Sequence, residues 1–555
     1  MQSRLKKIFF VLLLAIMSVP LFQRVTRLFK ETELRGAFFK PVQPKFSVDS
    51  LSTSAFQKQT EAYENFNFGF RGFMIKLKNS VDFLLYKDIS VTDQLEGKNG
   101  YIFSWGSIDR NITGDIYNGK VKNDATVSAI TFLRNEIEKK GARFLVAFAP
   151  SKDIIYPELL PEKYDGAVRL HSDRQDLADG FKKNNIPFID FTPYFQSIHK
   201  KTSEPLFTKT GFHWSVYGAS IAQDSLLSFM QQMYNEPMIA CERKGVEQSD
   251  TARWPDADFE VPMNLLFSLQ DNLYLYPKVE IIQSTLTRHR PKVIVIGDSF
   301  FATIKDQLVL RSIFSTDSKY WYYFNRSIPF TGVDDSEMKD IDIITELESA
   351  DFIILFGSLC TLGDFPYGFY DYYYKNVKLF GMVGRIEEYL KKDSLQINKI
   401  RKEAALKNES LESVITSEAR SIFKKRTQFH LQSPDHKYIC ADANKNNCLF
   451  ANRDVAWAWE TFSLLPLGND KFVMYSFESK FLTTEMQSQK EITASRQAIG
   501  EWEIFSMTRL DSSHVAFKGF NGKYLSVNKS IPGGQIFSSA DTIGYYEKFI
   551  MTEVQ

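Results

Sequence analysis

The chain has 555 residues, more than the roughly 250–300 at which a single hydrophobic core stops growing, so we expect several folded units. Hydrophobic residues make up 44% and charged residues 24%, which excludes a disordered chain and a protein of many membrane spans. The 68 Lys and Arg balance 67 Asp and Glu, so no global charge favours nucleic acid. Four cysteines without a C-x-x-C pair exclude a disulfide-dense scaffold, and we expect neither a metal nor a cofactor.

The N-terminus has the order of a secretion signal. An apolar run at residues 8–22 follows the basic Arg4, Lys6 and Lys7. The run is shorter than the roughly 20 residues of a full membrane span, yet no small-x-small cleavage site follows it. We therefore favour an uncleaved signal anchor over residues 1–30, ahead of a cleaved peptide or a buried core helix. The body is then exported and lies in the periplasm or outside the cell, tethered to the inner or cytoplasmic membrane.

Strand-like and helical patterns alternate through the middle of the chain. The runs at residues 293–296 and 352–356 are purely apolar or nearly so, which is typical of strands buried on both faces of a parallel sheet. A helical pattern at residues 125–139 leads to a strand-like run at 143–148, and a second helical pattern at 217–233 precedes the run at 293–296. This alternation predicts a doubly wound α/β domain.

Ser299 is the first candidate for chemistry, because it follows an apolar strand directly and precedes a helical pattern. At the carboxyl end of such a strand a hydroxyl can be exposed, while nearby backbone N–H groups and the helix N-terminus stabilise an oxyanion. We take Ser299 as a candidate nucleophile, with Gly297 and Phe300 as oxyanion candidates. A Gly-Asp-Ser tripeptide is also common as a plain helix cap.

His213 is the second candidate, because it precedes a helix and its side chain can act as a base near neutral pH. It could take the proton of the Ser299 hydroxyl. The alternative is a structural histidine packed beside Trp214.

Several short motifs occur in the order found in one known family. The motifs are Tyr63-Glu64-Asn65-Phe66-Asn67-Phe68-Gly69-Phe70-Arg71, Gly97-Lys98-Asn99-Gly100-Tyr101-Ile102-Phe103, Ala149-Pro150-Ser151-Lys152, Ile155-Tyr156-Pro157-Glu158-Leu159-Leu160-Pro161, His213-Trp214 and Gly297-Asp298-Ser299-Phe300. Through them the sequence resembles the SGNH-hydrolase-like proteins of the AlgX and AlgJ alginate O-acetylation type over residues 46–385. In this permuted family, as here, the histidine precedes the serine.

The resemblance implies an SGNH-hydrolase-like parallel sheet flanked by helices, and a polysaccharide O-acetyltransferase or acetylesterase. Ser299 would carry the acetyl group as an ester and His213 would be its general base. Trp214, Lys152 and Tyr101, which lie in the matching motifs, would bind substrate. The acetyl group would come from a membrane-bound O-acyltransferase, and the acceptor would be a cell-surface or exported polysaccharide.

One position departs from the family. The family has an aspartate two residues before the histidine, which orients the imidazole, whereas this chain has Gly211. Loss of such an aspartate can cost on the order of 10⁴-fold in rate. Asp190, Asp153 or a backbone carbonyl could replace it. The competing hypothesis is a catalytically inactive SGNH-like protein that binds glycans or assists assembly.

The C-terminal part contains an internal repeat. Residues 386–425 are charged and helical in pattern, which predicts a connector. Beyond it, three blocks recur at intervals of 43 or 44 residues over residues 426–555, and three strand-rich units of this length predict an all-β trefoil that resembles fascin-like and ricin-type trefoils. The blocks are Lys437-Tyr438-Ile439, Lys480-Phe481-Leu482 and Lys523-Tyr524-Leu525; Ala451-Asn452-Arg453 and Ala494-Ser495-Arg496; and Trp459-Glu460-Thr461-Phe462, Trp502-Glu503-Ile504-Phe505 and Tyr546-Glu547-Lys548-Phe549.

We expect the repeated Trp and Phe side chains to fill the core of the trefoil. The resemblance to ricin-type trefoils adds a carbohydrate-binding module to the predicted function. A third and weaker hypothesis is an adhesion or scaffold protein in which only the trefoil matters. Cys440 and Cys448 flank a polar loop, and either a disulfide or two free thiols fits their position.

Overall fold

The structure is a computed structural model that describes residues 2–36, 40–167, 172–202, 204–269, 273–307, 309–332, 335–468, 470–484 and 491–554. Its contacts divide the chain into two units. Unit 1 comprises residues 1–340 and 350–370, and unit 2 comprises residues 341–349 and 371–555. The predicted domain limits at 385 and 425 remain predictions.

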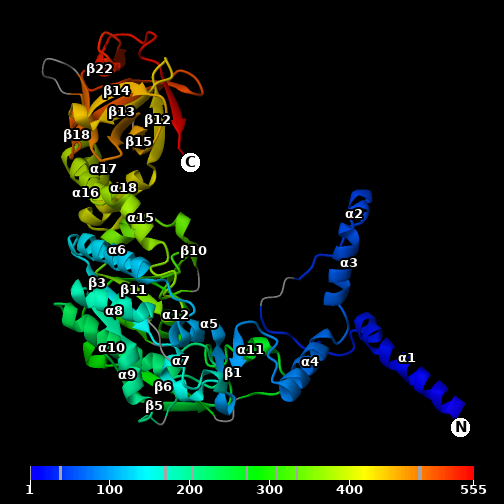
Figure 1. Cartoon of the computed structure of the whole chain (residues 1–555). Helices are drawn as coiled ribbons and strands as arrows, with labels where there is room; N and C mark the ends of the chain where they lie inside the picture. Colours follow the sequence, from blue (N-terminus) through cyan, green and yellow to red (C-terminus); the bar gives the residue numbers. More distant parts are fainter. Residues whose placement is uncertain are drawn as a thin grey trace. The chain divides into compact units, whose positions relative to one another are not determined.

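Unit 1 begins with a group of helices (Figure 1). Within the first of them, Arg4–Thr26 is long and apolar enough to cross a membrane, a property that a signal sequence shares. The helices are α1 (Gln2–Thr26), α2 (Val48–Ser52), α3 (Ala55–Phe66) and α4 (Arg71–Tyr86).

A seven-stranded sheet forms the centre of unit 1, in the order β10-β9-β8-β7-β11-β3-β4. Strands β8, β7, β11, β3 and β4 are parallel, whereas β9 and β10 add an antiparallel edge. The buried apolar runs of the sequence form β7 and β11, so the predicted α/β sheet is confirmed. The strands are β3 (Arg143–Ala149), β4 (Phe188–Asp190), β7 (Val293–Gly297), β8 (Lys319–Tyr322), β9 (Arg326–Pro329), β10 (Ser336–Glu337) and β11 (Phe352–Ser358).

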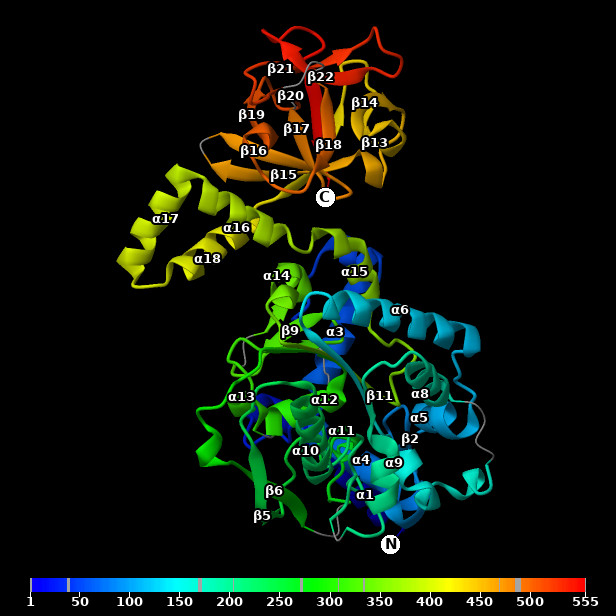
Figure 2. The same cartoon turned by 90° about the vertical axis from the view of Figure 1, so that its left-hand side faces the viewer.

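Helices flank this sheet, with α6 packed on α8 and α10 packed on α12 (Figure 2). Each pair buries an apolar stripe that includes Leu133 and Ile137 on α6 and Leu226 on α10. The helices are α5 (Trp105–Ile108), α6 (Lys120–Glu138), α7 (Lys152–Ile155), α8 (Asp173–Lys183), α9 (Phe191–Ile198), α10 (Val216–Met233), α12 (Ser299–Gln307) and α13 (Leu310–Ile313).

An antiparallel hairpin of β5 (Cys241–Ser249) and β6 (Tyr274–Ile281) interrupts the α/β pattern between α10 and β7. The connection between its strands contains a cis peptide bond before Pro255 and the short helix α11 (Glu260–Met263). A second small hairpin joins β1 (Gln94–Glu96) to β2 (Ile102–Ser104).

Unit 2 begins with helices and ends in an all-β barrel. Helix α16 packs on α18, and α17 packs on α18. The helices are α14 (Ile343–Glu348), α15 (Phe369–Asn376, which starts in unit 1), α16 (Met382–Lys392), α17 (Ser394–Lys407) and α18 (Leu411–Lys424).

Six strands of the barrel close into a ring, because β12 pairs β15, β15 pairs β16, β16 pairs β19, β19 pairs β20, β20 pairs β23, and β23 pairs β12. Three antiparallel hairpins, β13–β14, β17–β18 and β21–β22, account for the other strands that the structure describes in the barrel. The strands are β12 (Thr427–Gln432), β13 (Tyr438–Asp442), β14 (Cys448–Arg453), β15 (Thr461–Gly468), β16 (Lys471–Ser476), β17 (Phe481–Thr484), β18 (Ile492–Arg496), β19 (Ile504–Arg509), β20 (His514–Lys518), β21 (Tyr524–Asn528), β22 (Gln535–Ala540) and β23 (Phe549–Glu553).

The repeated Trp-Glu-x-Phe block has a structural explanation in each repeat. The glutamate is buried and its Oε2 accepts a backbone N–H three residues earlier, at 2.9 Å for Glu460, 2.8 Å for Glu503 and 2.7 Å for Glu547. The phenylalanine lies in the barrel core, as predicted. The prediction is wrong for the aromatic residue that opens the block, because Trp459 and Tyr546 are exposed.

The four cysteines are free thiols. In the described structure Cys440 lies opposite Phe450, and Cys448 lies opposite Asp442, in the same hairpin. Cys440 and Cys448 were expected to form either a disulfide or two free thiols, and in the structure they are two free thiols.

Candidate active site

Ser299 is the first residue of α12, directly after β7, and its side chain is partly exposed. The preceding Asp298 is fully buried and fixes this turn to the end of β11, because its Oδ2 accepts the N–H of Ser358 at 2.6 Å and the hydroxyl of Thr361 at 2.5 Å. The backbone carbonyl of Asp298 accepts the Tyr320 hydroxyl at 2.5 Å. Asp298 therefore positions the serine.

His213 lies in the loop before α10, and its Nε2 is 2.7 Å from Oγ of Ser299. Its imidazole is mostly buried and packs against Phe300, with ring centroids 4.6 Å apart. The structure thus brings together the two residues that the sequence suggested as base and nucleophile, 86 positions apart in the chain.

Asp258 completes a chain of hydrogen bonds, because its Oδ2 lies 2.5 Å from Nδ1 of His213. Its other oxygen accepts the backbone N–H of Phe212 at 2.5 Å. The two contacts hold the carboxylate from both sides and leave Nε2 of the imidazole facing Ser299. The arrangement can orient the ring and stabilise its protonated form.

The glycine at the departing position is explained by close packing. A Cβ added to Gly211 would lie 2.5 Å from Oγ1 of Thr208 and 3.3 Å from the carbonyl oxygens of Pro255 and Asp256. The connection between β5 and β6 thus occupies the space beside Gly211. The same connection supplies Asp258.

The two carboxylates that the sequence offered as replacements have other partners. Asp190 caps α9 and pairs with Arg174 at 2.5 Å, and Asp153 is buried and accepts the Ser107 hydroxyl at 2.5 Å. Sequence reasoning missed Asp258, because nothing in its local pattern marks it and only the tertiary fold brings the 254–258 segment to the histidine.

Two further buried groups beside Asp258 have shifted pKa values. Burial raises the pKa of Asp256 to about 7, with the nearby Asp258 charge adding to the effect and the Val216 N–H opposing it. Burial lowers the pKa of Lys152 to about 7, against the opposing effect of the Asp258 and Asp153 charges.

The oxyanion candidates require a correction. The N–H of Phe300 already donates to Oδ1 of Asp298 at 3.1 Å, so it is not directed at a substrate. Gly297 is paired with both neighbouring strands, and its carbonyl accepts the N–H of Tyr323 at 2.9 Å. The hydroxyl of Tyr323 lies near Ser299, whose side chain and backbone lower the pKa of the tyrosine against the larger effect of burial.

Tyr323 lies in the tight connection between β8 and β9, where it and Phe324 have positive φ angles of 48° and 53°. Such angles cost on the order of 1 kcal/mol or more for a bulky residue. The same connection directs the Tyr323 ring onto Tyr367, with centroids 5.2 Å apart, and the hydroxyl onto Ser299. Burial raises the pKa of Tyr323, so its proton is retained at neutral pH.

The predicted substrate-binding residues differ in accessibility. Trp214 is fully buried and its Nε1 donates to the Phe300 carbonyl at 3.2 Å, and Lys152 is buried with Nζ donating to the Ile102 carbonyl at 2.9 Å. Both side chains are thus engaged inside the protein, and the substrate-binding role of Trp214 and Lys152 stays a prediction. Tyr101 is half-buried. Trp254, which the sequence did not indicate, is 42% exposed and its ring lies 5.7 Å from the His213 ring.

Comparisons with known proteins match two parts of this chain. Residues 95–304 match the family model "SGNH hydrolase-like domain, acetyltransferase AlgX", and residues 424–552 match "Domain of unknown function (DUF7910)". A curated relative, the probable alginate O-acetylase AlgJ of Pseudomonas syringae pv. tomato, is 25% identical over 270 residues, which are 46% of this chain and 64% of the relative. The chain thus spans less than two thirds of that relative.

Two solved structures are also similar. The O-acetyltransferase domain of Pseudomonas putida AlgJ is 12% identical, with 49% of this chain and 92% of that chain covered and a TM-score of 0.31. AlgX of Pseudomonas aeruginosa is 14% identical, with 48% of this chain and 54% of that chain covered and a TM-score of 0.28. The family match and the curated relative together support an SGNH hydrolase-like domain of the AlgX and AlgJ type over residues 95–304.

Proposed function

We propose that this chain transfers acetyl groups to a polysaccharide through Ser299, His213 and Asp258. The observation that carries the proposal is the hydrogen-bonded series from Asp258 through His213 to Ser299, with distances of 2.5 and 2.7 Å. This is the geometry of a nucleophile, a base and an orienting carboxylate. It supplies the partner that Gly211 lacks and removes the reason to favour an inactive glycan-binding protein.

The chemistry has two halves. The Ser299 oxygen attacks the carbonyl carbon of an acetyl ester or thioester while His213 takes the hydroxyl proton, and the donor's alcohol or thiol leaves with that proton. A polysaccharide hydroxyl then attacks the acetyl-serine, His213 takes its proton, and the proton returns to Ser299. Water in place of the polysaccharide gives acetylesterase activity.

The negative charge on the acetyl oxygen needs donors near Ser299. We propose the backbone N–H of Ser299 and the hydroxyl of Tyr323 as these donors, because both lie at the serine and burial keeps the Tyr323 proton in place at neutral pH. The N-terminal end of α12 adds a favourable dipole.

The location and the partners follow from the N-terminal helix and the family. The apolar helix α1 would anchor the body outside the cytoplasmic membrane, where an exported polysaccharide is available. A membrane-bound O-acyltransferase would supply the acetyl group.

The C-terminal barrel is proposed as a β-trefoil that binds glycan. Its support is the closed six-stranded ring, the three hairpins and the threefold sequence repeat. Exposed Trp457 and Trp459 offer apolar rings for sugars. If they bind glycan, Trp457→Ala/Trp459→Ala weakens retention of the full chain on its polysaccharide while esterase activity is kept, and unchanged retention would contradict the role of this module.

The enzymatic proposal is tested with a chromogenic acetyl ester and with acetyl transfer to a polysaccharide. Ser299→Ala should abolish both activities, whereas the matched control Ser197→Ala, at an exposed serine of α9, should keep both. Equal rates for Ser299→Ala and the unmodified chain would refute the proposed enzymatic activity and favour the inactive glycan-binding protein instead.

A further inference from the structure

Helix α4 has its polar and apolar faces reversed relative to an ordinary surface helix. Its buried face carries Gly72, Asn79 and Ser80 together with Phe83. Its apolar residues are exposed: Leu84 by 61% and Leu85 by 67%, and the others by about two fifths. At about 100° per residue they share one arc of roughly 120°. The exposed members are Phe73, Met74, Leu77, Val81, Leu84 and Leu85.

The buried face of α4 is fixed by specific polar contacts. The Asn79 amide donates to the Met263 carbonyl at 2.8 Å, and the Ser80 hydroxyl accepts the N–H of Leu266 at 2.9 Å. These bonds set the rotation of the helix, so the apolar face cannot turn inward without losing them. A soluble protein rarely exposes such a continuous apolar stripe without a partner.

The partner that the surroundings favour is a lipid bilayer. The end of α1, the helix long enough to span a membrane, approaches the start of α4 so closely that a Cβ on Gly69 would lie 2.1 Å from the Pro20 carbonyl. Likewise, a Cβ on Gly72 would lie 1.9 Å from the Thr32 carbonyl. Two glycines therefore permit a membrane-length helix and an exposed apolar helix to meet.

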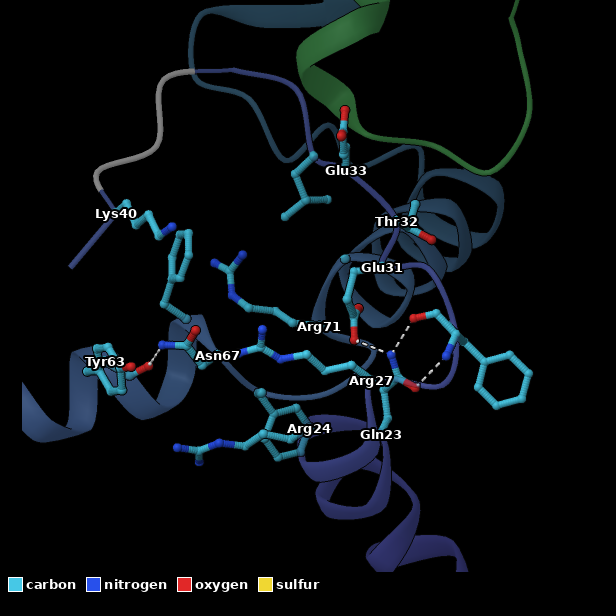
Figure 3. Close-up of a pocket in the computed structure, with 15 residues that line it drawn as sticks. Gln23, Arg24, Arg27, Glu31, Thr32, Glu33, Lys40, Tyr63, Asn67 and Arg71 are labelled. Atoms are coloured by element: carbon cyan, nitrogen blue, oxygen red, sulfur yellow. Dashed lines mark hydrogen bonds between the residues drawn. The ribbon is translucent and has the colours of Figure 1, made fainter. Parts of the chain in front are cut away.

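A cavity of about 750 Å³ lies at this meeting point (Figure 3). Gln23, which is nearly fully buried, shapes it by donating to the Phe29 carbonyl at 2.7 Å and to Glu31 at 3.0 Å. Four cationic side chains line it: Arg24, Arg27, Lys40 and Arg71.

The charges in this cavity are unbalanced. Arg24 is neutralised by Glu64. Among the residues that the structure describes, no ion pair is formed by Arg27, Lys40 or Arg71. Glu31 accepts hydrogen bonds from two neutral donors, Gln23 and the N–H of Phe70 at 2.9 Å, so its charge still counts, and three cations face the two carboxylates Glu31 and Glu33. The cavity therefore favours an anion, and paired guanidinium groups suit a phosphate.

We propose that this cavity binds the phosphate of an anionic phospholipid while the exposed face of α4 lies in the acyl-chain region beside α1. Tyr63 in the cavity lining suits the headgroup level, where tyrosine is enriched in membrane proteins, and the exposed Phe68 suits the apolar side of the interface. Basic pockets next to a membrane helix bind anionic headgroups. The inference rests on the proposed anchor but not on the acetyl-transfer chemistry.

The first test uses the full chain in a mild zwitterionic detergent, with its intact mass checked to establish that α1 is retained. Native mass spectrometry then measures binding of phosphatidylglycerol and phosphatidylcholine. We expect at least a ten-fold preference for phosphatidylglycerol, and loss of this preference in Arg27→Gln/Arg71→Gln. The matched control Lys182→Gln/Lys183→Gln, on the exposed surface of α8, should keep it.

Three outcomes would overturn the lipid site: no preference in a chain that retains α1, equal preference in the arginine variant, or full displacement of the lipid by an equal concentration of inorganic phosphate or of an anionic oligosaccharide. Esterase activity is measured on the same samples. Neither arginine belongs to the Ser299 site, so the two readouts are independent. Activity without lipid preference would refute the lipid site alone, and lipid preference without activity would refute the proposed enzymatic function alone.

The second test addresses the α4 face. A benzoylphenylalanine photocrosslinker replaces Leu84 in the full chain, which is reconstituted into nanodiscs containing phosphatidylglycerol. We expect a lipid adduct, and none from the same probe at Leu406, an exposed residue of α17. A protein adduct at position 84, or no lipid adduct there, would show that the stripe faces another partner or water.

Discussion

The carboxylate of Asp258 lies 2.5 Å from Nδ1 of His213 although the two residues are 45 positions apart. The aspartate arrives on the connection between β5 and β6 rather than from the motif that carries the histidine. The position two residues before the histidine is then free to be Gly211, and the same connection packs against it. A carboxylate thus contacts the imidazole although the motif position beside the histidine has none.

Asp258→Asn should lower kcat for a chromogenic acetyl ester by about 10³–10⁴-fold, because the amide cannot stabilise the protonated imidazole and favours the wrong tautomer. KM should change little. The matched control is Asp190→Asn, which alters the cap of α9 but does not touch His213. A loss of less than ten-fold in Asp258→Asn would contradict the orienting role.

Gly211→Asp restores the family motif in sequence but should not restore its function. The new Cβ would meet the Thr208 hydroxyl and the carbonyls of Pro255 and Asp256, so the connection that carries Asp258 must move. We expect a lower melting temperature and a kcat reduced together with it. Rescue of Asp258→Asn by Gly211→Asp, measured as ester hydrolysis by the double variant, would show that the two positions are interchangeable.

The sequence predicts the sheet and the two ends of the site for physical reasons. Bare apolar runs such as that of β7 are required in a sheet covered on both faces, and a serine directly after one of them lies at the sheet's functional edge. Asp258 and Tyr323 carry no such local mark, because Asp258 lies on the long connection between β5 and β6 and Tyr323 on a tight connection with positive φ angles. The sequence also cannot predict which side chains near the histidine are exposed. Trp214 and Trp254 are both tryptophans near His213, but tertiary packing buries Trp214 and leaves Trp254 exposed.

Tyr323→Phe should lower kcat by about 10²-fold, the effect of removing one donor from an oxyanion hole. The ring stays to pack against Tyr367, so the melting temperature should change little. Tyr322→Phe is the control, because Tyr322 precedes it on β8. Unchanged hydrolysis of the chromogenic ester by Tyr323→Phe would show that the Tyr323 hydroxyl does not stabilise the oxyanion.

Asp256→Asn should change how stability depends on pH. The pKa of Asp256 rises from 3.8 when unfolded to about 7 when folded, so the folded chain binds the extra proton between these values, and its stability falls as the pH rises from 3.8 through 7. Asparagine mimics the protonated form and removes this slope. Melting temperatures of the variant should match the unmodified chain near pH 4 and exceed it by several degrees at pH 8. The control Asp179→Asn, at an exposed aspartate, should follow the unmodified chain at every pH. If the melting temperatures of Asp256→Asn and the unmodified chain changed in parallel with pH, the raised pKa of Asp256 would be refuted.

Trp254→Ala should separate binding of the polysaccharide from the chemistry of the ester. The Trp254 ring is exposed beside His213, so a sugar whose hydroxyl reaches the acetyl-serine can lie against it, whereas a small chromogenic ester needs only Ser299 and its donors. We expect KM for the polysaccharide acceptor to rise about ten-fold, equivalent to about 1.4 kcal/mol, with kcat/KM for the chromogenic ester nearly unchanged. Tyr194→Ala, at an exposed aromatic residue of α9, should alter neither. Equal losses on both substrates would mean that Trp254 supports His213 rather than the glycan, because a contact made only with the sugar cannot affect a reaction in which no sugar takes part.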